Sequence, residues 1–468
     1  MINTKKQNNL MFIIVILMGG FLSSLTETLL NNAIPAIMRE VHVSQTSAQW
    51  LNTGYILVVG IMMPLSAYFL NRFRLKPLFI TTMVIFLFGT LISVMSSTFT
   101  FLLLGRLVQA ISVGISMSLT QSLMMLIFPI DKRGSAMGLS SIVIILGPAI
   151  GPTLSGWIVD QYSWQMLFII LIPISIIIII LSMIFVRNIT QPTGDKLDWK
   201  SLALSSLGFG ILLYGFSSIG NTGSVDLSSL VMVVVGIIFV ILFVIRQLKM
   251  EKPMLEMKVF KSISFTKTTI LAALSSIALL GVELILPLYV QNVRGVSALD
   301  SGLIMLPGAI IMGIISPIAG RLFDKHGIRW LAIIGFGILT LASVPMIWFD
   351  HTTSVVLIST LYAIRMLGLG LVMMQLNTSG VNALPAKYLV HGNTVASTFR
   401  QVASSLGSAL LVTVSTMTAK LSANGHDVTL ANTATGYQWT FMVVTGFSLL
   451  CFLMAFTLRN KTAAEITG

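Results

Sequence analysis

The chain has 468 residues, of which 55% are hydrophobic and only 9% are charged. A soluble domain is roughly 25% charged because its surface faces water, so most of this surface must face lipid. The 28 Lys+Arg against 15 Asp+Glu give a net charge of +13. The basic residues form small groups between apolar runs, without a basic and aromatic face, and this distribution argues against a nucleic-acid partner.

The first apolar run begins at Leu10, after Lys5 and Lys6, and continues past Gly19 and Gly20. A cleaved signal peptide also begins with a basic segment and an apolar run. This run is longer, however, and similar runs follow it along the whole chain. We therefore expect it to be the first membrane span.

A membrane span needs about 20 apolar residues to cross roughly 30 Å of hydrocarbon. Fourteen runs meet this requirement, and short polar or basic joints separate them. The sequence thus predicts an all-α polytopic membrane protein with 14 transmembrane helices. The expected spans are 10–34, 48–70, 77–96, 99–127, 136–159, 165–186, 199–219, 227–246, 264–290, 300–322, 328–348, 353–376, 393–418 and 436–458.

The charges in the joints predict the orientation of the chain. If the N-terminus is inside, the opposite side carries only Arg39, Arg294 and Lys420, and the other Lys and Arg residues of the joints fall on the inner side. The positive-inside rule then places both termini in the cytoplasm. The longest basic joint, 247–263, is amphiphilic, and either lies along the membrane surface or is a solvated linker.

Two joints resemble each other. The joint after the second span reads AYFLNRFRLKP and the joint after the tenth reads AGRLFDKHGIRW, which aligns Ala67 with Gly320 and Asn71 with Asp324. This internal repeat predicts duplicated units about 250 residues apart. We expect a first six-helix bundle in 1–190, two additional helices and a basic linker in 191–262, and a second six-helix bundle in 263–468.

With these motifs the chain resembles the major facilitator superfamily, and within it the fourteen-span drug:proton antiporter family. Gly320, Asp324, Gly327 and Arg329 match the loop motif G-x-x-x-D-x-x-G-x-R. The first-half copy is degraded, with Ala67, Asn71 and Arg74 at positions that the family fills with Gly, Asp and Gly. The resemblance implies that this loop acts in gating and that the second copy carries more of that role.

Further motifs carry the same resemblance. Arg106, Gln109 and Gly114 in the fourth span are similar to R-x-x-Q-G-x-G-x-G, although Ala110 replaces one glycine. In the first span an acid, Glu27, follows the position where the family has aspartate. The fifth span closely resembles the antiporter motif G-P-x-x-G-P-x-x-G-G and is the most specific of these signals. It contains Gly147, Pro148, Gly151, Pro152 and Gly156.

Four charged residues lie well inside expected spans, away from their ends: Glu27, Arg106, Glu283 and Arg365. A charge near the bilayer centre costs at least ~2.5 to 3.5 kcal/mol on insertion scales, so each is a functional candidate. Glu27 is either a hydrated carboxylate near the end of its span or a group that binds and releases a proton. We expect Glu27 and Glu283 to couple transport to protons, Arg106 to tune a nearby carboxylate or to pin helices together, and Arg365 to be structural.

The Gly/Pro stretch of the fifth span has no reactive group. Proline removes backbone donors and glycine lets helices touch, so we expect this span to bend and slide against a partner. Some of the 27 methionines could form an adaptable pocket, although most are expected in packing or lipid contacts. Trp50, Tyr55 and Tyr289 could line the cavity or mark the membrane interface.

The sequence contains no phosphate-binding G-x-x-x-x-G-K-[ST] loop, no zinc-protease His/Glu spacing and no G-x-S-x-G, so we expect neither an enzyme nor a metal site nor a cofactor. Proton-motive force is the expected energy source. The resemblance implies a monomeric exporter of small amphipathic, often cationic compounds in a bacterial plasma membrane, in contact with protons and membrane lipids. Alternatives are export of a lipid-like metabolite such as a fatty acid, and a membrane sensor without transport.

Overall fold

The computed structural model describes residues 2–30, 33–43, 45–190, 198–222, 225–251, 253–423, 426–427 and 429–459. These residues form helices and the turns that join them, without a strand. The chain divides into two compact units. Unit 1 contains 1–124, 143–210 and 242–256, and unit 2 contains 125–142, 211–241 and 257–468.

Ten helices lie in the first part of the chain, and α5, α6, α9 and α10 are each divided between the two units. A short 3-10 helix, η1 (Ile130–Lys132), precedes α6. The helices are α1 (Ile2–Thr28), α2 (Ile34–Val41), α3 (Gln45–Arg72), α4 (Leu75–Val94), α5 (Phe99–Ile127), α6 (Arg133–Gln161), α7 (Met166–Ile169), α8 (Leu171–Phe185), α9 (Trp199–Thr222) and α10 (Leu227–Lys249).

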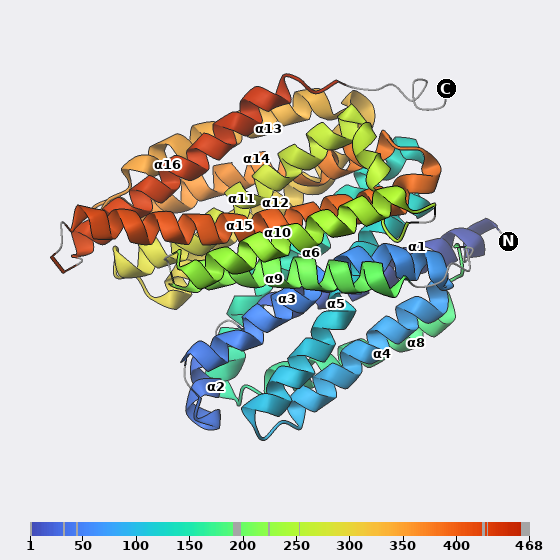
Figure 1. Cartoon of the computed structure of the whole chain (residues 1–468), viewed down its shortest axis with the longest axis horizontal. Coiled ribbons are helices and arrows are strands. Elements are labelled where there is room, and N and C mark those ends of the chain that lie inside the picture. Colours follow the sequence, from blue (N-terminus) through green and yellow to red (C-terminus); the bar gives the residue numbers. More distant parts are fainter. Residues whose placement is uncertain are drawn as a thin grey trace. The chain divides into compact units, whose positions relative to one another are not determined.

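The remaining helices belong to unit 2, where α13, α14 and α16 lie side by side (Figure 1). They are η2 (Met257–Lys261), α11 (Ile263–Asn292), α12 (Ala298–His326), α13 (Ile328–Ser343), η3 (Val344–Trp348), α14 (Val355–Asn382), η4 (Ala386–Tyr388), α15 (Leu389–Ser422) and α16 (Leu430–Ala455).

Thirteen helices of the described residues are long and apolar enough to cross a membrane. Each coincides with one expected span, and α6 coincides with the remaining one. The all-helical fold and the set of spans agree with the sequence. The first span is shorter than expected: α1 ends at Thr28, and the separate helix α2 starts at Ile34, with proline in its first turn, where the ring is tolerated.

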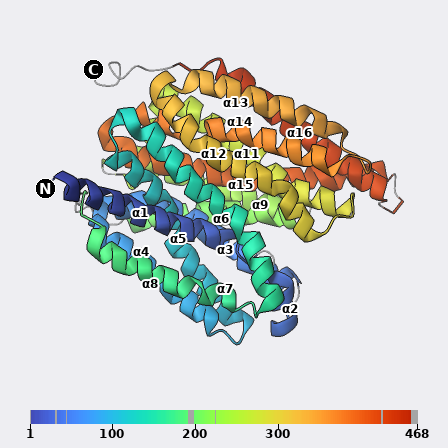
Figure 2. The ribbon, with the colours of Figure 1, turned by 180° about the vertical axis from the view of Figure 1, so that it is seen from behind.

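The same kind of helix crossing occurs in each unit. In unit 1, Gly89 of α4 lies on the backbone of Gly105 in α5, and a Cβ at Gly89 would come within 2.8 Å of the Gly105 carbonyl oxygen. In unit 2, Gly335 of α13 lies equally close to the backbone of Gly368 in α14. Helices in lipid associate by close packing of small residues, and these pairs fix where the helices cross. In unit 1, α4 also packs against α8 (Figure 2).

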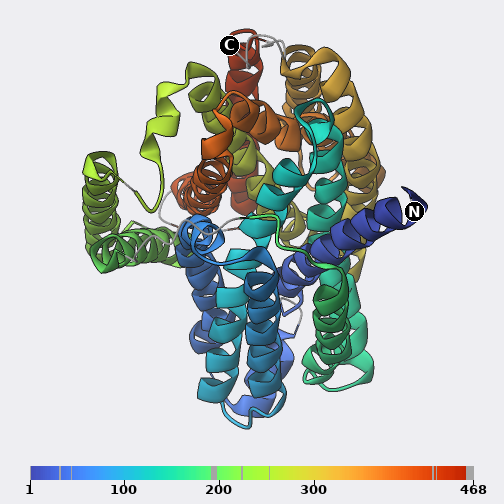
Figure 3. The same cartoon turned by 90° about the vertical axis from the view of Figure 1, so that its right-hand side faces the viewer.

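The additional helices α9 and α10, green in Figure 3, form a hairpin. A Cβ at Gly236 would lie 2.6 Å from the backbone nitrogen of Leu212. At the basic end, Arg246 makes a bidentate ion pair with Asp198, with Nε–Oδ2 and Nη2–Oδ1 distances of 2.7 and 2.9 Å.

The basic joint 247–263 buries several of its apolar residues within the protein. Its apolar side chains Met254, Leu255, Met257 and Val259 are each 7% exposed or less. The Leu255 amide donates to the side-chain oxygen of Gln247 at 3.0 Å. The apolar side of this joint therefore packs against protein, which contradicts a plain solvated linker.

Candidate functional site

In unit 1, a fully buried arginine lies beside the acid of the first span. Arg106 of α5 is 0% exposed, and its guanidinium carbon lies 3.9 Å from the centre of the Tyr55 ring on α3. Its Nη1 donates to the carbonyl oxygen of Thr26 at 3.3 Å and to Oε1 of Gln109 at 3.2 Å. Glu27, the residue after Thr26, is half-buried. We call Glu27, Tyr55, Arg106 and Gln109 the unit 1 cluster.

The hydrogen bonds of the unit 1 cluster leave part of the arginine unsatisfied. Gln109 is fixed by a 2.7 Å bond from its Nε2 to the Thr90 hydroxyl of α4. Nε and Nη2 of Arg106 have no hydrogen-bond acceptor in the part of the chain that the structure describes. The positive charge is compensated by the face of Tyr55, through a cation–π contact, and by the carboxylate of Glu27 through space.

The glycines of the fifth-span motif pack directly on the helix that carries Glu27. A Cβ at Gly147 of α6 would lie 2.6 Å from the backbone nitrogen of Leu25 and 2.7 Å from the carbonyl carbon of Ser24. A Cβ at Gly151 would meet the hydroxyl of Thr28. The Ser24 hydroxyl donates to the Ile144 carbonyl at 2.8 Å. The motif therefore sets how closely α6 approaches α1 at the level of Glu27.

Two other residues of the motif, Pro148 and Gly156, are half-buried in α6. The Pro152 side chain lies outside those that the structure describes.

Unit 2 contains a counterpart of the unit 1 cluster. Arg365 of α14 is 0% exposed; its Nη2 donates to the carbonyl oxygen of Ala278 on α11 at 2.6 Å, and its Nε donates to the Ser343 hydroxyl at 2.9 Å. Glu283 of α11 is half-buried and acts electrostatically on Arg365 and on the buried Tyr362. We call Tyr362, Arg365, Ser343 and Glu283 the unit 2 cluster.

The internal repeat relates the two clusters. Glu27 and Glu283 are 256 residues apart, and Arg106 and Arg365 are 259 apart. In both, the arginine bonds a carbonyl of the helix that bears the acid. Sequence reasoning named all four charged residues and Tyr55, but not Tyr362 or Ser343. The repeat offset is the signal that could have related Arg365 to Arg106, but the sequence reasoning did not use it for these residues.

The loop motif holds the start of α6 within unit 2. The carboxylate of Asp324, at the end of α12, accepts from the backbone nitrogens of Gly134 and Ser135 at 2.8 and 2.9 Å, and from the Ser135 hydroxyl. A Cβ at Gly320 would fall on the Gly134 carbonyl, so this glycine permits the approach. A carboxylate at a helix N-terminus is stabilised by the free amides and the helix dipole.

The remaining motif residues set the geometry of this contact. Gly327 has φ 73°, a left-handed conformation that glycine adopts without strain, and it separates α12 from α13. Arg329 is exposed in the first turn of α13. Next to Gly134, Nη1 of Arg133 donates to Oδ1 of Asn382 at 2.9 Å, a bond that the sequence did not suggest. In unit 1, Arg74 has φ −64° where the second copy has Gly327.

Within the described residues, no group of three or more His, Cys, Asp or Glu side chains could hold a metal ion. The one cysteine, Cys451, is buried and unpaired.

Comparison with known proteins assigns the family. The family model of the Major Facilitator Superfamily matches residues 16–408. The chain belongs to this superfamily. A member of the Major Facilitator Superfamily is a secondary transporter, so this protein is a multi-pass membrane transporter of small substrates and not an enzyme.

Several members of the superfamily are similar to this chain. The uncharacterized MFS-type transporter YcnB of Bacillus subtilis is 44% identical over 98% of this chain and 97% of its own. The lincomycin resistance protein LmrB of Listeria innocua is 37% identical over 93% of this chain and 94% of its own. The crystal structure of the human organic anion transporter MFSD10 superposes with a TM-score of 0.67 at 14% identity, covering 95% of this chain and 99% of that one, which supports the fold alone.

Proposed function

We propose that this transporter exports small amphipathic, often cationic compounds in exchange for protons, by alternating access of two bundles. It belongs to the fourteen-span drug:proton antiporter family and acts as a monomer in a bacterial plasma membrane, with both termini in the cytoplasm. The observation that carries the proposal is the unit 1 cluster, in which Glu27 lies beside the fully buried, incompletely hydrogen-bonded Arg106.

The cluster supports proton coupling for an electrostatic reason. Desolvation makes a charged group costly, and an arginine with unpaired N–H groups is stabilised by a nearby carboxylate only while that carboxylate is ionised. Protonation of Glu27 therefore changes the balance of charge around Arg106. A proton bound to Glu27 on one side of the membrane and released on the other would bias the two states of the transporter.

The packing of α6 on α1 supports transmission of this change. Gly147 contacts backbone atoms of α1, which cannot rotate away as a side chain can. A shift of α1 at Glu27 must then be accompanied by a shift of α6. At its other end, α6 is held by Asp324, whose charge-assisted bonds would stabilise one state of the gate and release in the other.

The substrate class is supported by composition and relatives. The acids Glu27 and Glu283 favour a cationic substrate, and apolar helices favour an amphipathic one. The similarity to LmrB supports drug export, lincomycin included. Export of a lipid-like metabolite such as a fatty acid, and sensing without transport, are the competing functions.

Transport by purified protein in proteoliposomes tests this proposal. Uptake of cationic dyes, lincomycin and fatty acids is measured with an outward or an inward pH gradient, or with none. We expect accumulation of a dye or of lincomycin that requires the gradient and is abolished by a protonophore. Gradient-driven flux of fatty acids alone would favour the lipid-like substrate, and binding without flux of any compound would favour the sensor.

A further inference from the structure

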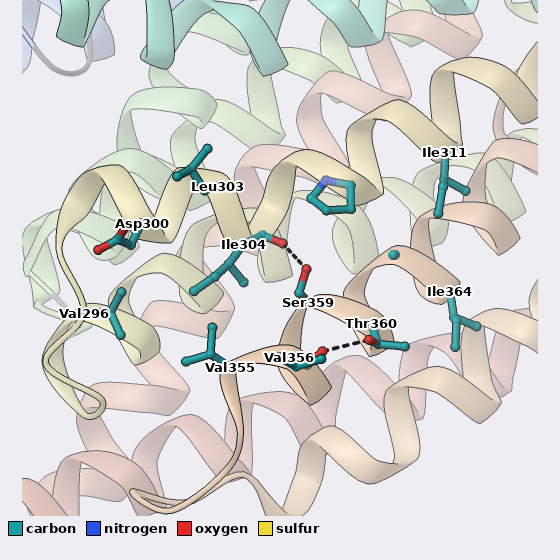
Figure 4. Close-up of a pocket in the computed structure, with 12 residues that line it drawn as sticks. Val296, Asp300, Leu303, Ile304, Ile311, Val355, Val356, Ser359, Thr360 and Ile364 are labelled. Atoms are coloured by element: carbon teal, nitrogen blue, oxygen red, sulfur yellow. Dashed lines mark hydrogen bonds between the residues drawn. The ribbon is translucent and has the colours of Figure 1, made fainter.

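An apolar groove lies between α12 and α14 of unit 2 (Figure 4). Its volume is about 750 Å³. The walls are mainly apolar and include Leu303, Ile304, Pro307, Val355, Val356 and Ile364. The carboxylate of Asp300 lies at one end, and Ile311 and Ile364 lie toward the other (Figure 4).

The groove is closed toward the protein and open toward its surroundings. On the closed side, the Ser359 hydroxyl donates to the Ile304 carbonyl at 2.8 Å, and Gly308 lies against the ring of Tyr362. On the open side, Leu303 is 51% exposed and Val356 is 74% exposed. Because α12 and α14 are membrane spans, these exposed apolar side chains face lipid.

The length of the groove matches one leaflet of a bilayer. From Asp300 to Ile311, α12 rises by about 16 Å at 1.5 Å per residue. From Val355 to Ile364, α14 rises by about 14 Å. The hydrocarbon core of a bilayer is ~30 Å thick, so one leaflet is about 15 Å. An extended acyl chain whose head group lies at Asp300 would fill the groove.

The polar end of the groove favours a cationic head group. Asp300 is exposed in the first turn of α12, where its Oδ2 accepts from the hydroxyl of the N-cap residue Ser297 at 2.7 Å. Its Oδ1 accepts no hydrogen bond from the residues that the structure describes. An ammonium group carries three donors and can bond this oxygen, whereas an anionic head group would be repelled.

We propose that the groove binds one acyl chain of an amine-bearing phospholipid, phosphatidylethanolamine, with the ammonium group on Asp300. Under the proposed topology this is a lipid of the outer leaflet, because Asp300 lies at the end of α12 opposite Lys325. The bound chain covers the α12–α14 contact, behind which lies Tyr362 of the unit 2 cluster. The site does not depend on the identity of the exported compound.

Native mass spectrometry of the purified protein with added phosphatidylethanolamine or phosphatidylglycerol of identical acyl chains tests this site. We expect the wild-type protein to retain phosphatidylethanolamine in preference. Asp300→Asn should lower this retention about fivefold, equivalent to ~1 kcal/mol, and should not lower retention of phosphatidylglycerol, from which it removes a like-charge repulsion. Asp226→Asn, which changes another acid at a helix N-terminus outside the groove, is the matched control and should change neither lipid.

A second variant tests the apolar part. Thr360→Trp places a large ring in the groove from an exposed position on α14 and should reduce retention of both lipids without lowering the midpoint of thermal unfolding. Equal retention of the two lipids by the wild type, or no effect of either variant, would overturn the proposal. Loss of tetraphenylphosphonium binding in Thr360→Trp with unchanged lipid retention would assign the groove to a cationic substrate instead.

Discussion

In unit 1 only one of the three guanidinium nitrogens of Arg106 is hydrogen-bonded within the described residues, whereas in unit 2 two nitrogens of Arg365 are, to Ser343 and Ala278. Both arginines are fully buried, and each interacts electrostatically with the acid of its own unit, Glu27 or Glu283. A buried charge with more complete hydrogen bonds depends less on its carboxylate. The comparison assigns proton coupling mainly to unit 1 and a more structural role to Arg365.

The strongest way to break this comparison is to neutralise each acid. Glu27→Gln should lower pH-driven efflux about hundredfold, ~2.7 kcal/mol, because it leaves the positive charge of Arg106 without its compensating carboxylate. Glu283→Gln should lower efflux only about threefold, because Arg365 keeps its bonds to Ser343 and Ala278. Efflux is measured in proteoliposomes with equal amounts of folded protein. A larger loss from Glu283→Gln would reverse the assignment of the two units.

Packing beside each acid gives a second contrast. Gly147→Ala should lower transport about tenfold, because its Cβ would meet backbone atoms of α1, and overpacking typically costs about 1 to 3 kcal/mol. Gly281→Ala, two residues before Glu283, meets only side chains, first that of Leu411, and should be tolerated better. Gly446→Ala, which meets nothing within 4 Å, is the control. Transport rates of the three variants in one assay check the order, and equal rates would remove α6 from the mechanism.

The two copies of the loop motif also differ between the halves of the chain, because the second copy has Asp324 where the first has Asn71. Asp324→Asn should weaken the hold on the start of α6 about fivefold, because the amide loses the charge that three donors stabilise. Asn71→Ala should do much less. The measurement is the labelling rate of Ala136→Cys, a residue that is 0% exposed, in a Cys451→Ser background. Faster labelling is expected with Asp324→Asn and not with Asn71→Ala. Equal labelling rates in these two variants would refute the asymmetry.

The smallest effect is expected in the additional helices, which neither repeat contains. The Arg246 guanidinium lowers the pKa of Asp198 to about 2. The stabilisation from this pair is therefore present above the ordinary aspartate pKa and is lost as the pH falls toward 2. Asp198→Asn should lower stability by less than ~1 kcal/mol from pH 5 to 8, because the pair is partly exposed, and leave transport unchanged. Thermal unfolding at both pH values measures this, and loss of pH-driven efflux would show that these helices take part in coupling.

Much of the fold could be predicted from the sequence because membrane spans are long apolar runs. The repeat also emerged from local motifs, since the joint with Gly320 and Asp324 aligns with the joint that has Ala67 and Asn71 at the corresponding positions. The division of the chain into bundles by residue order, and the roles of the motif residues, stay predictions. The break between α1 and α2 was missed because the flanking apolar residues Leu29, Leu30, Ala33 and Ile34 outweighed Asn31 and Asn32 in the count of apolar residues.

The contacts of the site could not be predicted from the sequence. Stacking of Tyr55 on Arg106, and the bonds of Asp324 to Gly134 and Ser135, join helices far apart in the chain. They depend on the crossing points that the glycines set. The pattern of residue types indicates that a buried acid needs a hydrogen-bonding or charged partner. Which group is that partner depends on how the helices pack.

Proton release on substrate binding tests the central claim, that Glu27 carries the coupled proton, most directly. Purified protein in weakly buffered detergent solution is mixed with the substrate found in the proteoliposome screen, and a pH indicator records the protons released. We expect release from the wild type, the same release from Glu283→Gln, and none from Glu27→Gln, which still binds the substrate. Wild-type release from Glu27→Gln would contradict the account.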